Sequence, residues 1–205
     1  MKATDFNLEK EMRLDPETGI ATFKGSRLVI FDANAVGLLR QNLLEKVGWE
    51  TAREIVFRFG FQHGYSDAMQ MKVNYEFEED MDWLTAGPVI HTWEGIVKAT
   101  PSRLQYDRNT GEFLFTGVWT NSYEAEQYLS FNKPAAEPVC WSLSGYASGY
   151  ASAFFGSPIL TIEPCCVGMG HDHCEWKLQP IDKWGPEAKP YLTAVKDMLG
   201  GRYNG

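Results

Sequence analysis

The sequence predicts an α+β fold, with helices and antiparallel strands mixed along one chain. Residues 89–97 and 112–121 alternate between inward-facing apolar positions and other side chains, which is typical of strands. Other segments carry helix start and stop signals around an apolar stripe. The two kinds of segment do not follow one another in regular βαβ order, which favours α+β. With 205 residues, 44% hydrophobic and 14% aromatic, the chain is long and apolar enough to bury a core.

The first part of the chain is expected to form a short strand and then two helices. The strand covers residues 27–31, and Asp32 or Asn34 is expected to cap the helix after it. Gly48 is expected to stop that helix, and a second helix runs from about residue 50 to residue 71. The predicted apolar stripes are Leu38, Leu39, Leu43, Leu44 and Val47 in the first helix and Ala52, Ile55, Val56, Phe59, His63 and Ala68 in the second.

Two strand-like segments in the middle of the chain carry the candidate ligand-binding side chains. Alternation in residues 89–97 (VIHTWEGIV) places on one face Val89, His91, Trp93 and Val97. Alternation in residues 112–121 (EFLFTGVWTN) places on one face Phe113, Phe115, Gly117 and Trp119. Taken alone, a histidine or a tryptophan at such a position is more often a satisfied core residue than a ligand contact.

The remaining elements are three helices and two strands. Asn121 and Ser122, followed by Glu124, predict the start of a helix over YEAEQYLSF. A long helix over residues 138–155 is rich in Gly, Ala and Ser, so another element or a ligand can approach it closely. Residues 159–163 and 174–178 are expected to be strands joined by a loop of Cys, Gly and His, and residues 186–199 form an amphipathic helix.

Charge and hydropathy exclude several classes of partner. The 19 basic and 27 acidic residues give a net charge of −8, and no Lys/Arg cluster is present, which disfavours direct contact with nucleic acid or an anionic membrane. Each apolar run is too short to span a membrane. Residues 1–14 are charged throughout and do not resemble a secretory signal, so we expect a cytoplasmic protein with reduced cysteines.

The cysteines suggest a metal site. Cys140, Cys166 and Cys174 can supply three thiolates, and a closed structural zinc site needs four ligands. The candidates for the fourth ligand are Cys165, Glu163, His171 and His173. Buried cysteines also pack as small apolar residues, but the loop over residues 164–174 (PCCVGMGHDHC) has few core residues to explain them. The local sequence therefore favours a metal over simple packing.

These segments also resemble a known family. The stretch Glu137-Pro-Val-Cys-Trp-Ser-Leu-Ser-Gly-Tyr-Ala-Ser-Gly-Tyr, followed by Glu163-x-x-Cys166-x(7)-Cys174, resembles the 4-vinyl-reductase-type module of bacterial aromatic sensors. Upstream, Ala86-Gly-Pro-x-x-His91 and Val118-Trp119 resemble the N-terminal sensory part of the XylR/DmpR/PoxR/MopR group of sigma-54-dependent transcriptional activators. The resemblance extends from about residue 27 to residue 178.

The resemblance implies a ligand set for the metal and a division of the chain. The family's structural zinc ligands fall on Cys140, Glu163, Cys166 and Cys174. Residues 1–125 would be the aromatic-sensor and dimerisation region, and residues 126–205 the zinc-binding 4-vinyl-reductase-type region, together forming one sensory unit. Zinc would then tie the helix that carries Cys140 to the two strands beside the cysteine loop.

The resemblance also implies a binding site for a phenol. In phenol-responsive members, a His and a Trp hold the phenol hydroxyl, and these positions fall on His91 and Trp119, while Tyr150 falls on a pocket-lining position. An imidazole nitrogen and an indole N–H can together accept from and donate to one hydroxyl, and a ligand such as toluene would leave them unpaired. The family's pocket pattern differs from this sequence at three positions, Leu84, Trp93 and Gly117.

The family implies a regulatory function. We expect a domain that binds phenol or a small phenolic and controls the ATPase of a sigma-54 activator, as a homodimer formed through the N-terminal segment. The sequence has no G-x-x-x-x-G-K-[ST] motif and no C-terminal helix-turn-helix, so the ATPase and DNA-binding domains would lie in another part of a longer protein.

Three alternatives stay open on the sequence. The effector could be a non-phenolic aromatic such as benzene or toluene, because Leu84, Trp93 and Gly117 depart from the family's pattern. The chain could be a zinc-dependent enzyme of aromatic acids, although it has no GxGxxG, Ser-His-Asp order or HExxH, so we expect no enzyme. It could also be a purely structural zinc module that binds a protein partner.

Overall fold

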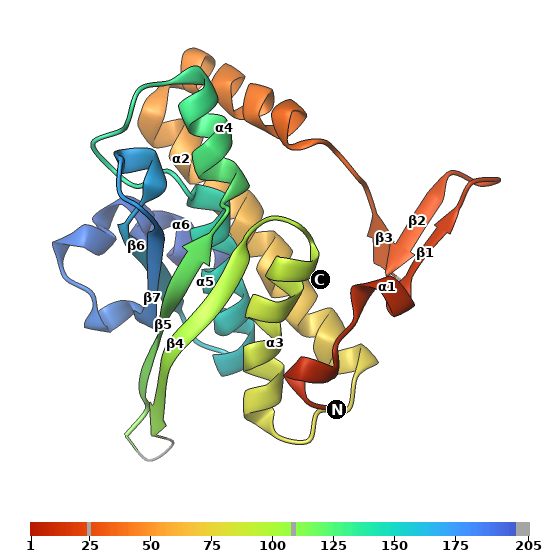
Figure 1. Ribbon diagram of the computed structural model, residues 1–205. Coiled ribbons are helices and arrows are strands. Elements are labelled where there is room, and N and C mark those ends of the chain that lie inside the picture. The colour runs from red at the N-terminus through yellow and green to blue at the C-terminus, as the bar shows by residue number, and fades with distance from the viewer. Residues whose placement is uncertain (24–25, 108–109, 200–205) are drawn as a thin grey trace.

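The computed structural model describes residues 1–23, 26–107 and 110–199 and confirms the α+β class (Figure 1). Its centre is an antiparallel sheet in the order β4-β5-β7-β6. The bounds of these strands are β4 Lys98–Asp107, β5 Glu112–Thr120, β6 Ile159–Cys165 and β7 Cys174–Pro180. Helix α5 (Trp141–Phe155) packs on this sheet, and helix α2 (Ala33–Asn74) packs along α5. The core therefore lies between the sheet and two helices.

The N-terminal segment forms a small unit that projects from this body. Its strands pair antiparallel in the order β1-β2-β3, and the sheet stands apart from the larger one in Figure 1. The bounds are η1 Ala3–Asp5, α1 Leu8–Glu11, β1 Met12–Asp15, β2 Ile20–Phe23 and β3 Ser26–Leu28. The strand predicted over residues 27–31 is thus shorter than expected, because the chain leaves the sheet after Leu28 and runs on to α2.

Helix α2 begins and bends where the sequence indicates. The Asp32 side chain caps it by accepting a hydrogen bond from the backbone N–H of Ala35 at 2.8 Å. Gly48 adopts φ of 79° inside the helical span, so the two helices that the sequence separates there meet at a kink. A left-handed φ is open to glycine at no steric cost, which is why the direction changes at this residue.

The buried face of α2 differs from the predicted apolar stripes. Leu39 is 61% exposed and Phe59 is 65% exposed, and four more members of the stripes are exposed or only half-buried, namely Leu38, Val47, Ile55 and His63. The helix instead packs through Gly60 and Gly64, beside buried Phe57 and Phe61. A hydrophobic stripe gives weight to large side chains, whereas this contact needs the absence of side chains.

The contact between α2 and α5 is a contact between two backbones. A Cβ built at Gly60 would overlap the carbonyl oxygen of Ser142, and one built at Gly149 would overlap the carbonyl oxygen of Phe61. The small residues of the predicted helix over 138–155 therefore do let another element approach closely. Because α5 also carries pocket and cysteine side chains, this contact sets the position of both.

Replacing Gly149 by alanine is expected to push α2 and α5 apart. Overpacking of a well-packed core costs about 1–3 kcal/mol, and here the obstructing atom belongs to the backbone. Urea unfolding of Gly149→Ala should show this loss. The exposed position Gln62 on α2 provides the control, since Gln62→Ala should change the free energy of unfolding by no more than about 0.5 kcal/mol. Equal stability of Gly149→Ala and the parent would contradict the close contact.

The strand predicted over residues 89–97 is wrong. Helix α3 (Asp80–Trp93) covers this segment up to Trp93, and a turn at Gly95 leads into β4. The buried residues of α3 recur at helical spacing, namely Trp83, Leu84, Ala86, Gly87, Ile90 and His91. Trp93 lies two residues, or about 200°, around the helix from His91 and is 37% exposed instead of sharing its face.

The other predicted elements are confirmed with small changes of bounds. β5 buries the four side chains that alternation places on one face. Ser122 caps α4 (Tyr123–Phe131) by accepting from the backbone N–H of Ala125. The C-terminal helix is α6 (Lys189–Leu199), preceded by the short turns η3 Ile181–Lys183 and η4 Pro186–Ala188, and η2 (Val167–Met169) lies in the cysteine loop. Among the described residues, no helix is both long and apolar enough to cross a bilayer.

Candidate functional site

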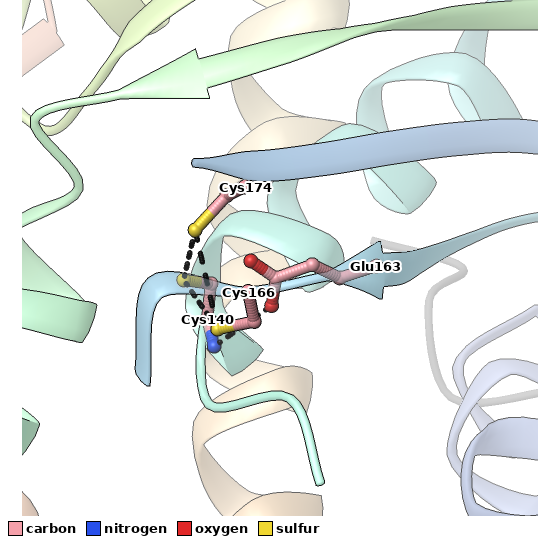
Figure 2. Close-up of side chains that lie close together, drawn as sticks. All are labelled: Cys140, Glu163, Cys166 and Cys174. Atoms are coloured by element: carbon pink, nitrogen blue, oxygen red, sulfur yellow. Dashed lines mark hydrogen bonds between the residues drawn. The ribbon is translucent and has the colours of Figure 1, made fainter. Parts of the chain in front are cut away.

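Four side chains that are distant in the sequence form a buried cluster. Cys140 immediately precedes α5, Glu163 lies on β6, Cys166 follows that strand, and Cys174 begins β7. Figure 2 shows the four side chains pointing toward one another from these elements. All four residues are at most 3% exposed, and their ligand atoms lie within 4.8 Å of one another. The structure thus brings together all three of the cysteines that the sequence singles out, with Glu163.

The spacing of the three sulfur atoms fits a tetrahedral metal. The Sγ atoms of Cys140 and Cys174 are 3.8 Å apart, and each lies 3.9 Å from the Sγ atom of Cys166. Three thiolates bonded to one zinc at about 2.3 Å in tetrahedral geometry lie about 3.8 Å from one another. The three sulfur atoms therefore occupy three corners of such a tetrahedron.

Glu163 is placed to supply the fourth ligand. One carboxylate oxygen, Oε2, accepts a hydrogen bond from the backbone N–H of Cys140 at 3.3 Å, while the buried Oε1 has no hydrogen-bond partner. Burial raises the pKa of the Glu163 carboxyl and of the Cys140 thiol well above their ordinary values. A divalent cation would hold these groups ionised and would use the unpartnered oxygen.

The other candidates for the fourth ligand hold the loop instead. Cys165 Sγ donates to the carbonyl oxygen of His173 at 3.3 Å. The Nδ1 atom of His171 accepts a hydrogen bond from the backbone N–H of Cys166 at 3.0 Å, and His173 pairs with Glu175 at the surface. These contacts keep Cys166 and Cys174 in place, and none of the three side chains joins the cluster.

A second site is a pocket of about 380 Å³, its open mouth included, which lies between α3, α5 and the sheet. This size is at the lower end of the range for small-molecule sites. The lining contains His91 from α3, Trp119 from β5 and Tyr150 from α5, the three side chains predicted to meet a ligand. The other lining residues are Leu84, Gly87, Pro88, Ala99, Phe115, Tyr146, Ala147, Ala151, Trp176 and Leu178.

His91 is a polar group without a polar partner in this pocket. The residue is 3% exposed, and its imidazole stacks on the ring of Tyr146 with centroids 4.1 Å apart and planes inclined by 11°. Over residues 1–23, 26–107 and 110–199, no protein group forms a hydrogen bond with the imidazole. Burial, together with the charge of His63, lowers the pKa of His91 to about 3. The imidazole is therefore neutral near pH 7, with one nitrogen free to accept a hydrogen bond.

Nitrogen-15 shifts of the imidazole test this state directly. We expect His91 to stay neutral from pH 8 down to pH 5 in the folded domain, whereas an unperturbed histidine titrates near pH 6.5. Because only the unfolded chain binds this proton between about pH 6.5 and about pH 3, its contribution to stability falls as the pH falls through that window. A protonation step of His91 between pH 5 and pH 7 would contradict the burial described above.

Trp119 and Tyr150 differ in what their polar atoms do. Trp119 is 2% exposed, and its ring centroid lies 6.4 Å from that of His91. Its indole N–H has no acceptor in the described part of the chain. The Tyr150 hydroxyl donates to the carbonyl oxygen of Trp83 at 2.8 Å, so Tyr150 offers the pocket its ring alone.

Tyr146 is a pocket residue that the sequence analysis missed. Its hydroxyl donates to Asp67 at 3.0 Å, and the Nε2 atom of His63 lies 3.4 Å from Asp67 and 3.5 Å from Glu94. Burial, and next the charge of Glu94, raise the pKa of Asp67 to about 7. This network fixes the ring that stacks on His91. The spacing of Tyr146 and Tyr150, four residues apart on one helix, is a signal that could have identified both.

The three positions that depart from the family pattern have different surroundings. Leu84 lines the pocket, while Trp93 is exposed and is not among the lining residues. Gly117 pairs with Trp176 across β5 and β7, and a Cβ at Gly117 would overlap the Trp176 ring. The indole of Trp176 thus covers the position where Gly117 has no side chain.

The two sites share helix α5. Cys140 stands at its N-terminal end, and Tyr146 and Tyr150 follow one and two turns later on the pocket side. The Glu124 carboxylate caps the helix by accepting from the backbone N–H groups of Ser142 and Leu143 at 2.8 and 3.1 Å. A change in the cysteine cluster would therefore reach the pocket wall through a single rigid element.

Comparisons with known proteins agree with this arrangement. A family described as activator of aromatic catabolism matches residues 7–107, and the 4-vinyl-reductase-type domain matches residues 118–180. The chain is 32% identical over 171 residues to the phenol regulator MopR of Acinetobacter guillouiae, and 29% identical over 180 residues to the transcriptional regulatory protein XylR of Pseudomonas putida. The matches cover 83% and 87% of this chain, which spans 30% and 32% of the length of those relatives.

A solved structure matches nearly the whole chain. It is the crystal structure, with phenol, of the phenol-responsive sensory domain of the transcription activator PoxR. The TM-score is 0.85 at 32% sequence identity, and the match covers 94% of each chain. These relatives are regulatory proteins and not enzymes. The chain belongs to the family of N-terminal aromatic-sensing domains of transcription activators that includes XylR, MopR and PoxR.

Proposed function

We propose that this chain senses phenol or a small phenolic and thereby controls the ATPase of a sigma-54-dependent activator. One observation carries the proposal. A buried, neutral imidazole without a protein partner, that of His91, lies beside the indole of Trp119 in an otherwise apolar pocket. A buried polar group without a partner costs free energy, which a ligand hydroxyl would recover.

The two side chains match the hydroxyl of a phenol. Its O–H can donate to the free imidazole nitrogen of His91, and its oxygen can accept from the indole N–H of Trp119. The ring of the ligand would meet apolar neighbours such as Leu84, Phe115 and Leu178. Toluene would fill the same space but leave both polar groups unpaired, and this difference favours phenols. The phenol named for MopR and PoxR supports the same effector class.

Calorimetric titration of the metal-loaded domain with phenol and with toluene tests the proposal. We expect one saturable phenol site per chain, lost in His91→Ala and absent with toluene. Trp93→Ala is the matched control, because Trp93 lies on the same turn of α3 but is exposed, and phenol should bind this variant as it binds the parent.

Other outcomes point to the alternatives. Toluene binding that does not depend on His91 would indicate a sensor of non-phenolic aromatics such as benzene. Slow conversion of phenol or a hydroxycinnamate into product would indicate the zinc-dependent enzyme of aromatic acids. Absence of binding to well-folded protein would indicate a structural zinc module with a protein partner.

We infer that the metal of the cysteine cluster is a structural zinc ion. Three thiolates with one carboxylate suit zinc, and a set of four protein ligands leaves no open position for catalysis. Cys140, Glu163, Cys166 and Cys174 would tie the start of α5 to β6 and β7. The 1–125 and 126–205 regions would in this way act as one sensory unit, because α2 and α3 from the first pack on α5 from the second.

A homodimer formed through the N-terminal segment is part of the proposal. The chain between β3 and α2 exposes three consecutive apolar side chains, Val29, Ile30 and Phe31, at 68% to 70% of their surface. An exposed apolar run of this kind is typical of a protein contact.

Light scattering should show a dimer for the parent domain. The double variant Ile30→Asp/Phe31→Asp should have half that mass, because the charges would have to be buried in the contact. Val73→Asp is the control, since Val73 is 76% exposed near the end of α2 and should leave the dimer intact. A double variant that stays dimeric would place the contact elsewhere.

The partners of the domain would be the ATPase and DNA-binding parts of a longer activator, with no nucleic-acid contact of its own. A ligand that binds one of two states more tightly shifts their populations, and this shift would relieve repression of the ATPase. A role in transcription places the domain in the cytoplasm.

A further inference from the structure

Trp176 is a buried pocket residue whose polar atom has no partner. The residue is 3% exposed and lines the pocket, and its indole Nε1 makes no hydrogen bond to any group of the described chain. Trp83, Trp141, Trp184 and Trp49 all donate from this atom to a carbonyl or carboxylate oxygen. In the described residues, the two buried tryptophans whose indoles lack an acceptor, Trp119 and Trp176, are the two that line the pocket.

The polar groups of the pocket can be counted against the needs of a phenol. The hydroxyls of Tyr146 and Tyr150 are already engaged with Asp67 and with a backbone carbonyl. This leaves His91, Trp119 and Trp176 as the lining side chains with free polar atoms. One ligand hydroxyl satisfies an acceptor and a donor, namely the first two. The Trp176 N–H is then left over, and a buried donor without a partner is rare.

The position of Trp176 depends on Gly117. The indole lies across the place of the missing Gly117 side chain, and its ring centroid is 6.2 Å from that of Trp119. A ligand hydroxyl held by His91 and Trp119 would therefore place the rest of its ring one neighbour away from the Trp176 donor. Phe115 packs edge-on against the same indole at 4.9 Å and keeps it in this orientation.

We propose that Trp176 forms a second polar subsite, which selects phenols bearing a hydrogen-bond acceptor on the ring, such as a methoxy group. This proposal rests on the proposed phenol function and adds a ring substituent to it. Nε1–H donates to the substituent oxygen, so a phenol with an alkyl group of the same size leaves the donor unpaired. Gly117 contributes by leaving the space in which the indole lies.

Paired ligands measure this subsite. Methoxyphenols and ethylphenols substituted at the same ring position have nearly the same shape, and only the methoxyphenols carry the acceptor oxygen. Titrating the ortho, meta and para pairs against the zinc-loaded domain should give, at one position, about tenfold tighter binding of the methoxyphenol. In Trp176→Phe this ratio should fall to about one, while phenol itself binds within about threefold of the parent. Trp184→Phe, which removes an indole that already has a partner, should keep the ratio.

The outcomes separate the two proposals. Phenol binding that requires His91, with no methoxy preference at any position or with a preference that survives in Trp176→Phe, would overturn the subsite and leave the phenol function standing. Phenol binding that ignores His91 would overturn the proposed function. Should Trp176→Phe fail to fold, the indole N–H resonance of Trp176 in the parent decides. It should move downfield with the preferred methoxyphenol and not with its ethyl counterpart, and equal shifts would overturn the subsite.

Discussion

Removing the metal is expected to unfold the domain or to lower its melting midpoint by at least about 20 °C. Structural zinc contributes ~10–16 kcal/mol in small metal-folded peptides, and each kcal/mol moves the midpoint of a domain of this size by about 2–4 °C. The cluster joins the start of α5 to β6 and β7, so its loss leaves three buried thiols and a buried carboxyl without a counter-charge. Circular dichroism after chelation, with zinc measured by mass spectrometry, checks this result.

Neighbouring cysteines provide the matched pair for that experiment. Cys166→Ser should lose both zinc and the cooperative melting transition, whereas Cys165→Ser should keep both, because the Cys165 thiol donates to a carbonyl oxygen outside the cluster. Phenol binding should disappear with the metal, since α5 carries both Cys140 and the pocket ring of Tyr150. Metal-free protein with an unchanged midpoint, or equal zinc loss in the two variants, would show that the cluster is not a structural metal site.

Glu124→Ala is expected to cost about 3–5 kcal/mol of stability, the usual loss when one partner of a buried ion pair is removed. The carboxylate lies 3.2 Å from the Arg40 guanidinium, and both side chains are at least 93% buried. Its second oxygen accepts from the two backbone N–H groups at the start of α5. The variant would leave the Arg40 charge buried and the helix end without its cap.

Chemical denaturation with saturating zinc measures this loss. Glu124→Gln keeps an acceptor for the helix N–H groups and should lose clearly less than Glu124→Ala. Glu126 is the control, because it lies on the same helix but is exposed, and Glu126→Ala should change the free energy of unfolding by about 0.5 kcal/mol or less. A Glu124→Ala variant as stable as the control would show that the ion pair and cap contribute nothing.

Local chemistry in the sequence determined several features. Ser122 and Asp32 can satisfy free N–H groups at a helix start wherever they fold, and Gly48 can turn the chain at low cost. Strict alternation in β5 assigned its buried face because every second residue of a strand points to the same side. The three cysteines indicated a metal because a polar loop gives thiols little packing of their own.

Tertiary structure decided the rest. The fourth member of the cysteine cluster, Glu163, is separated in sequence from Cys140 and lies beside it because β6 packs on α5. The segment of His91 alternates like a strand over a few residues, but packing of α3 on α5 and β4 makes it a helix. The buried face of α2 follows its glycines because two backbones meet there, and Trp176 covers Gly117 because the strands that carry them pair. Short-range patterns specify caps, turns and alternation, whereas these contacts depend on which distant residues share a surface.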